Sequence, residues 1–214
     1  MRVKICGMTR KEDVEAALDS GADAVGFVVG TPAAQRNLRL DTAHRLMKIV
    51  PFLTAKVAVT NTSNLNLLQR ICLTLKPDAL QLHKYNQNIL HSIREKNPEL
   101  KIITATAIRD YQSILDASQT AKISDATLAD TPNPSTRGGT GKTHNWNLTL
   151  QLRKRIQPHP LILAGGLTAH NVRLAIRTVH PYAVDVSSGV EARIGVKDHR
   201  KIREFIRNAK ENIT

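Results

Sequence analysis

The 214-residue chain is long enough for one sizeable core, and its 41% hydrophobic and 23% charged residues are typical of a globular protein. No stretch reaches the roughly 18 consecutive apolar residues of a membrane span, so the sequence excludes an integral membrane protein of helical type. The two cysteines, Cys6 and Cys72, predict no disulfide framework and fit a reducing cytoplasm, where we expect the protein to reside.

The formal net charge of +13 is the unusual bulk property. A basic surface attracts phosphate backbones, but the lysines and arginines are spread along the chain without a run of five. With one Trp, three Tyr and three Phe, the chain also lacks the aromatic residues of a base-stacking platform. We therefore expect a small anionic substrate and no nucleic-acid partner.

Short β-branched runs alternate along the chain with amphipathic stretches. The expected strands cover residues 2–6, 23–29, 55–59, 78–82, 101–105, 125–130, 161–165 and 183–187.

The intervening segments have helical spacing of apolar residues. In the third, the steps of three and four predict one buried face that holds Leu65, Leu68, Cys72 and Leu75. Gly21 is expected to end the first helix in the left-handed conformation. Asp41 and Thr168 are the expected N-caps of the second and seventh helices.

Eight strand–helix units predict an α/β fold, a single (β/α)8 barrel, with residues 1–214 as one catalytic domain. A doubly wound open sheet has the same alternation and stays open as an alternative. The segment 130–146 is rich in Pro, Gly, Ser and Thr and is interpreted as a mobile loop.

Active sites of such barrels lie at the C-terminal ends of the strands. Cys6 ends the first expected strand, Asp130 ends the sixth, Asp185 lies on the eighth, and Arg36 follows the second. Glycines and hydroxyls after the last two strands are suited to a phosphate, because their backbone N–H groups can approach one anion closely. These expected phosphate ligands are Gly165, Gly166, Ser187, Ser188 and Gly189.

The segments "KICGMTR", "GADAVGFV", "LQLH", "GGTGKTHNW", "LILAGGLT", "PYAVDVSSGVE" and "GVKD" follow one another along the chain. In this order, from residue 3 to about 210, the sequence resembles the phosphoribosylanthranilate isomerases of tryptophan biosynthesis. The resemblance implies a (β/α)8 barrel and a cofactor-free Amadori rearrangement of N-(5-phospho-β-D-ribosyl)anthranilate to 1-(2-carboxyphenylamino)-1-deoxy-D-ribulose 5-phosphate.

The resemblance also implies roles for single residues. Cys6 matches the family's general base, Asp130 its general acid, and Arg36 the arginine that meets the anthranilate carboxylate. A thiol is a weak base at neutral pH unless a cation lies close by, and Lys4 faces the same side of the strand. Asp185 is expected either to pair with Lys4 or to meet the ribose hydroxyls.

Other polar residues have plainer interpretations. Cys72 is expected in the core, and His83 either touches the site or is structural. No histidine or cysteine spacing of a metal site is present, and "GGTGK" at 138–142 is interpreted as a closing loop.

The sequence departs from the family pattern at Lys84, Thr104 and His144–Asn145, and these departures leave open which residues bind the anthranilate ring. Two alternatives stay open: a related sugar-phosphate isomerase of histidine biosynthesis, and a nonenzymatic basic binding protein. The former needs a second phosphate site, for which the loop at 60–64 has no glycine pair. The chain is expected to be a monomer or a homodimer.

Overall fold

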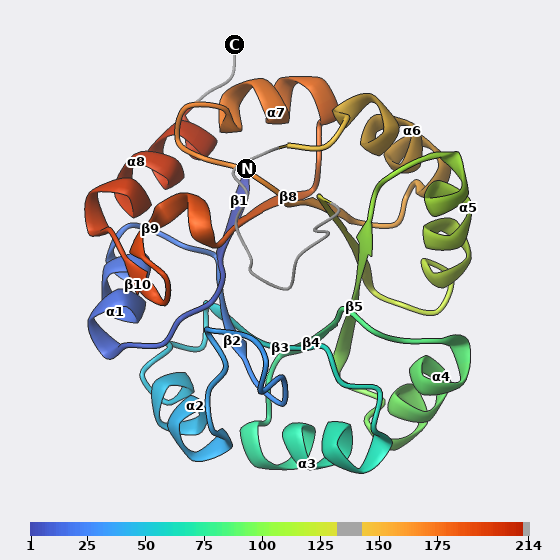
Figure 1. Cartoon of the computed structure of the whole chain (residues 1–214), viewed down its shortest axis with the longest axis horizontal. Coiled ribbons are helices and arrows are strands. Elements are labelled where there is room, and N and C mark those ends of the chain that lie inside the picture. Colours follow the sequence, from blue (N-terminus) through green and yellow to red (C-terminus); the bar gives the residue numbers. More distant parts are fainter. Residues whose placement is uncertain (132–142, 212–214) are drawn as a thin grey trace.

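The computed structural model describes residues 1–131 and 143–211, in which eight parallel strands close into a barrel (Figure 1). Each strand pairs with the next along the chain, and the last pairs with the first, so the barrel prediction is confirmed and the open sheet is wrong. The barrel strands are β1 Arg2–Ile5, β2 Ala24–Val28, β3 Ala55–Thr60, β4 Ala79–Leu82, β5 Lys101–Ala107, β6 Ala126–Asp130, β7 Leu161–Leu163 and β8 Ala183–Val186.

Helices surround the barrel as an outer ring (Figure 1). They are α1 Lys11–Asp19, α2 Leu40–Met47, α3 Leu65–Leu75, α4 Gln87–Lys96, α5 Tyr111–Thr120, α6 Trp146–Ile156, α7 Val172–Val179 and α8 His199–Lys210. Helix α3 buries Leu68, Cys72 and Leu75 as expected, together with Ile71. Leu65, the first residue of the helix, was expected on this buried face but is 40% exposed.

The end of α1 follows the prediction. Gly21 has φ +88°, its N–H donates to the carbonyl of Leu18, and the N–H of Ala22 donates to the carbonyl of Ala17. This pair of bonds satisfies the last carbonyls of the helix, and the left-handed residue between them favours glycine.

Both predicted N-caps are wrong. Helix α2 begins at Leu40, so Asp41 lies within its first turn and its carboxylate meets Arg39 at 3.2 Å. Helix α7 begins at Val172, and the side chain of Asn171 accepts the N–H of Thr168 at 2.8 Å. A tight turn therefore precedes the helix at the place where Thr168 was expected to begin it.

Alternation along the strands sorts side chains between two cores. One set points outward to the helices, as Val3 and Ile5 do on β1. The barrel interior is lined by Cys6, Val57, Val59, Ala79, Ile103, Ala105, Leu128, Ile162, Ala164 and Ala183. Lys4 shares the interior side with Cys6, as the spacing of two residues predicts.

A short connecting segment with its own secondary structure lies between β8 and α8. It contains the 3-10 turn η1 Ser188–Val190 and an antiparallel hairpin of β9 Glu191–Arg193 and β10 Val196–Lys197. The hydroxyl of Thr9 donates to the carbonyl of Gly195, and Asp13 accepts the backbone N–H of Lys197 at 3.1 Å. These contacts fasten the hairpin to the β1–α1 connection.

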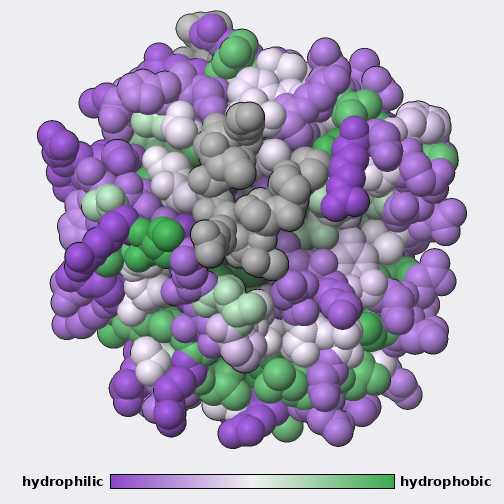
Figure 2. Space-filling view, viewed as in Figure 1, coloured by the Kyte–Doolittle hydropathy of each residue, from purple (hydrophilic) through white to green (hydrophobic). Residues whose placement is uncertain are grey.

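The face of the molecule in Figure 2 is covered mostly by hydrophilic side chains, with hydrophobic ones in small separate groups. Across the described ranges, no helix combines the length and the apolar character that crossing a bilayer requires.

Candidate active site

A buried ion pair lies where the first and last strands of the barrel meet. Lys4 and Asp185 are register partners on β1 and β8, and Nζ of Lys4 lies 2.9 Å from Oδ1 of Asp185. Lys4 is 3% exposed and Asp185 is 7% exposed, so the pair is shielded from solvent. Of the two positions expected for Asp185, the structure has the pairing with Lys4.

Cys6 follows directly after β1, and its backbone N–H donates to Val186 at 2.8 Å. A Cβ atom on Gly26 of the neighbouring strand would lie 2.9 Å from Sγ of Cys6 and 3.1 Å from Nζ of Lys4. The absence of a side chain at this position therefore leaves room for the thiol and the ammonium group side by side. The position of Cys6 just after β1 thus places its Sγ beside a buried cation.

Opposing influences act on the Cys6 thiol. Burial raises its pKa, Lys4 and Lys197 lower it, Asp185 raises it, and the net result is a pKa above the ordinary thiol value. Burial disfavours the charged form of Lys4, but Asp185 and Cys6 outweigh burial and raise the Lys4 pKa. The thiol therefore lies beside an ammonium group that stays charged and stabilises the thiolate form.

Asp130 ends β6 and faces the same group of charges. Its Oδ1 accepts the N–H of Thr131 at 2.7 Å. Burial, and then Asp185, raise the pKa of Asp130 to about 6, although the Thr131 N–H and Lys4 act in the opposite direction. A carboxyl with this pKa holds a proton for part of the time near neutral pH, as a general acid must.

The loops after β7 and β8 approach each other closely. Gly165 and Gly166 have φ +84° and +64°, and a Cβ on Gly165 would lie 2.9 Å from Oδ1 of Asp130. A Cβ on Gly189 would lie 1.9 Å from the carbonyl oxygen of Leu167. Glycines permit both approaches: Gly165 brings the β7 loop against Asp130 at the end of β6, and Gly189 brings the β8 loop against the β7 loop.

Backbone donors remain available on these loops. Within residues 1–131 and 143–211, the N–H groups of Gly165, Gly166 and Ser188 donate to no other group. Ser187 lies against the first loop of the barrel, with its Oγ 2.9 Å from the position of a Cβ on Gly7. Closely spaced free N–H groups of this kind bind oxyanions.

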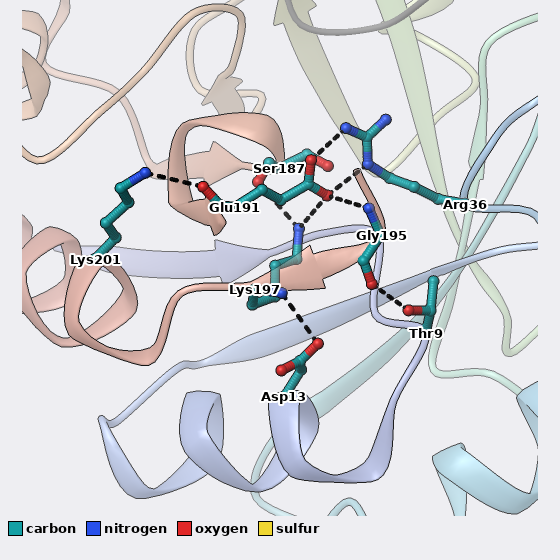
Figure 3. Close-up of polar contacts among 8 residues, drawn as sticks. All are labelled: Thr9, Asp13, Arg36, Ser187, Glu191, Gly195, Lys197 and Lys201. Atoms are coloured by element: carbon teal, nitrogen blue, oxygen red, sulfur yellow. Dashed lines mark hydrogen bonds and ion pairs between the residues drawn. The ribbon is translucent and has the colours of Figure 1, made fainter. Parts of the chain in front are cut away.

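Arg36, on the loop after β2, is held in place by a carboxylate. Its Nε lies 2.7 Å from Oε1 of Glu191 and its Nη2 lies 2.5 Å from Oε2, which forms a two-point pair (Figure 3). Its stem passes over Gly7, where a Cβ would lie 2.7 Å from Cδ of Arg36. Glu191 is the main cause of a raised Arg36 pKa, and Cys6 contributes to it, so this guanidinium belongs to the same site.

Sequence reasoning assigned no role to Glu191 or Lys197, which the structure places in this cluster. Glu191 bonds Arg36, and the ammonium group of Lys197 lies 3.2 Å from Glu191 and 3.0 Å from the Ser187 carbonyl. Both residues lie in the "SSGVE" and "GVKD" segments. The signal that could have found them is a charged residue within the segments on which the resemblance to the family rests.

His83 follows β4 and reaches the edge of the same site. Its Nε2 lies 2.9 Å from Nε2 of Gln81. His83 is exposed to solvent at the rim of the barrel, and partial desolvation there, with Lys4, lowers the pKa of His83, so the imidazole is neutral at physiological pH. Lys84 lies with His83 along an adjoining groove.

The other departures from the family pattern, at Thr104 and His144–Asn145, make contacts within the protein scaffold. Thr104 points away from the barrel interior and contacts Ser124, with 3.2 Å between the hydroxyl oxygens. His144 lies 3.1 Å from the hydroxyl of Thr131, and Asn145 caps α6. Cys72 is buried on α3, apart from the site. The "GGTGK" segment lies outside the described residues.

Comparison with known proteins decides the family. The model of the N-(5'-phosphoribosyl)anthranilate isomerase family matches residues 3–208. The chain belongs to this family. An N-(5'-phosphoribosyl)anthranilate isomerase of Methanothrix thermoacetophila is 41% identical over 98% of both sequences, and one of Halorubrum lacusprofundi is 39% identical over 97% of this chain and 96% of the relative.

Solved structures agree. A phosphoribosylanthranilate isomerase from Thermotoga maritima has a TM-score of 0.89 and 38% identity over 98% of both chains. A phosphoribosylanthranilate isomerase in complex with reduced 1-(o-carboxyphenylamino)-1-deoxyribulose 5-phosphate has a TM-score of 0.85 and 35% identity, again over 98% of both chains. The protein is thus an isomerase enzyme of the phosphoribosylanthranilate isomerase family with the family's barrel fold.

Proposed function

We propose that the protein catalyses the Amadori rearrangement of N-(5-phospho-β-D-ribosyl)anthranilate, with Asp130 as general acid and Cys6 as general base. The observation that carries this proposal is that a carboxyl group and a thiol group, two groups that can exchange protons, lie at the same end of the barrel. Asp130, whose pKa is raised to about 6, and the Cys6 thiol, which lies near the ammonium groups of Lys4 and Lys197, both interact with the Lys4–Asp185 pair. Anion-binding groups lie on either side of them.

The first step opens the ribose ring. The carboxyl of Asp130 gives its proton to the ring oxygen while the bond from that oxygen to C1' breaks. The anthranilate nitrogen supplies the electron pair that forms the C1'–N double bond, so a protonated Schiff base results. The ionised Asp130 is left beside the N–H of Thr131, which stabilises the new carboxylate.

The second step moves a proton from C2'. The Cys6 thiolate removes it, the C2' electrons form a double bond to C1', and the C1'–N electrons return to nitrogen. The resulting enolamine becomes the ketone when its hydroxyl proton leaves and C1' gains a proton. Atoms and charge balance without an oxidant, because the reaction only relocates hydrogen.

Only the microstate with protonated Asp130 and ionised Cys6 is productive. The pKa of Asp130 is about 6 and that of the Cys6 thiol is above the ordinary thiol value, so this microstate is a minority. Lys4 and Lys197 increase its population because they stabilise the thiolate. The two lysines therefore act on the rate although neither carries the transferred proton.

The substrate's two anionic ends fit the two flanks of the site. The N–H groups of Gly165, Gly166 and Ser188, with Ser187 and Gly189 on the same loops, are proposed to bind the phosphate. Arg36 is proposed to bind the anthranilate carboxylate, because its guanidinium presents paired donors to two oxygens. His83 would lie beside the ribose, where a neutral imidazole adds no charge.

The direct test is to add phosphoribosylanthranilate and follow the loss of its fluorescence. Turnover that disappears in Asp130→Asn and in Cys6→Ala supports the proposal. Turnover of the aminoimidazole substrate of histidine biosynthesis instead would favour the related sugar-phosphate isomerase. Absence of turnover with both substrates would favour a nonenzymatic basic binding protein.

We also propose that residues 1–214 act as one catalytic domain in the cytoplasm, within tryptophan biosynthesis. The oligomeric state is either a monomer or a homodimer, and one of the similar solved structures concerns monomers made from a dimeric isomerase. Sedimentation equilibrium distinguishes the two states, because the chain mass is 23.6 kDa.

A further inference from the structure

Arg36 has more donors than its two-point pair uses. Glu191 takes the edge formed by Nε and Nη2, which leaves Nη1 and the second Nη2 hydrogen (Figure 3). These remaining donors form the terminal edge of the guanidinium, which is the other edge able to bind two carboxylate oxygens. Among residues 1–131 and 143–211, the guanidinium of Arg36 is thus held at one edge by Glu191, and its terminal edge has no hydrogen-bond partner.

Glu191 itself is held from several directions. Its Oε1 accepts from Lys197 at 3.2 Å and from the N–H of Gly195 at 3.3 Å, and its carbonyl accepts from Lys201 at 2.9 Å (Figure 3). Glu191 is 8% exposed and Lys197 is 3% exposed. Because the hairpin that carries both is fastened to Thr9 and Asp13, the carboxylate has a fixed position before substrate arrives.

The charge of the cluster suits a single anion. Arg36 and Lys197 are cations, and within the described residues Glu191 is the acidic side chain that pairs with both, so the three side chains carry a net charge of +1. Burial would raise the pKa of Glu191, but Arg36 and Lys197 outweigh burial and lower it, so this carboxylate stays ionised. Glu191 is therefore poorly suited to transfer a proton and well suited to hold the Arg36 guanidinium in place.

We propose that Glu191 is a positioning residue that presents the terminal edge of Arg36 to the substrate's carboxylate and so governs substrate capture. This inference rests on the proposed function, because it takes the carboxylate bound by Arg36 to be that of the anthranilate ring. Loss of the anchor lets the guanidinium rotate, and the site then loses affinity for the carboxylate without losing its acid or its base.

The experiment compares Glu191→Gln with the parent protein on two substrates: phosphoribosylanthranilate, and the phosphoribosyl adduct of aniline, which lacks the carboxylate. For phosphoribosylanthranilate, we expect KM to rise about 10- to 100-fold, the typical effect of one oriented charged hydrogen-bond pair, with kcat within about threefold. For the aniline adduct, both proteins should have similar KM values, because the group that Arg36 binds is gone.

Asp125→Asn is the matched control. Asp125 also pairs with an arginine, with Nη2 of Arg94 at 2.5 Å, but it precedes β6 at the opposite end of the barrel. It should change KM for neither substrate. The double variant Glu191→Gln/Lys197→Met avoids leaving a buried ammonium group unpaired if the single variant fails to fold, and the same contrast between the two substrates is expected of it.

An unchanged KM in a folded Glu191 variant, or an equal rise for both substrates, would overturn the inference. So would a loss confined to kcat, since that is the result expected if Glu191 took part in proton transfer. A parent protein that converts neither substrate overturns the proposed function as well, and that outcome is recognised before any variant is compared.

Discussion

Replacing Asp130 by Asn should abolish most turnover and make the folded protein more stable at neutral pH. Burial raises the pKa of Asp130 from its ordinary 3.8 to about 6. At about 1.4 kcal/mol per pKa unit, the ionised carboxylate costs the folded state up to about 3 kcal/mol. This cost is absent below the unfolded-state pKa, where the group is protonated in both states, and it reaches its full size above pH 6. Asn carries no charge at any pH.

The assay is urea unfolding of both proteins at a series of pH values from 4 to 8, alongside turnover. The difference between the two free energies of unfolding should be smallest at pH 4 and grow until the pH exceeds about 6, with the Asn variant then more stable by up to about 3 kcal/mol. Turnover should fall by about 10²- to 10⁴-fold, as for loss of a general acid.

Asp125→Asn supplies a control of opposite sign. Burial alone would raise the pKa of Asp125, but Arg94 and the Ile102 N–H outweigh burial and lower it. Its carboxylate thus stabilises the folded state above the unfolded-state pKa, and this stabilisation is lost as the pH falls. A stability gain in Asp130→Asn that is equal at pH 4 and pH 8, or no gain at all, would refute the reasoning.

Three further results are expected. Cys6→Ala should lose at least about 10²-fold in turnover, while Cys72→Ala keeps near-normal turnover, so equal losses would exclude Cys6 as the base. The pKa of the Cys6 thiol can be followed by the ultraviolet absorbance of the thiolate in a Cys72→Ala background. This pKa should fall in Asp185→Asn and rise in Lys197→Met, because Asp185 raises it and Lys197 lowers it. Shifts in the same direction would contradict this. Binding to duplex DNA should be weak, independent of sequence and lost with salt, and tight selective binding would restore the nucleic-acid interpretation.

Much of the site was predictable because strand geometry and motif order are local properties. The period of two along β1 puts Lys4 and Cys6 on one side, and closure of the barrel puts Asp185 beside them. Glycines such as Gly165 mark places where backbone must approach backbone, and they can be recognised in the sequence without the structure.

The rest depends on contacts that no local pattern contains. Thr168 has the right side chain for an N-cap, but Asn171 forms the turn and the helix begins later. Glu191 and Arg36 are 155 residues apart, so their pairing follows from the path of two loops and not from spacing. The raised pKa of Asp130 likewise depends on burial, which only the assembled barrel provides.

The Lys4–Asp185 pair joins residues 181 positions apart, across the seam where the barrel closes. During synthesis, the lysine therefore emerges long before its counter-ion. A growing chain that has not yet produced β8 therefore has an ammonium group that must stay hydrated, and this group opposes premature collapse of the strand that carries the thiol. The reactive centre forms only when the ring of strands is complete, so enzymatic activity reports the final step of assembly.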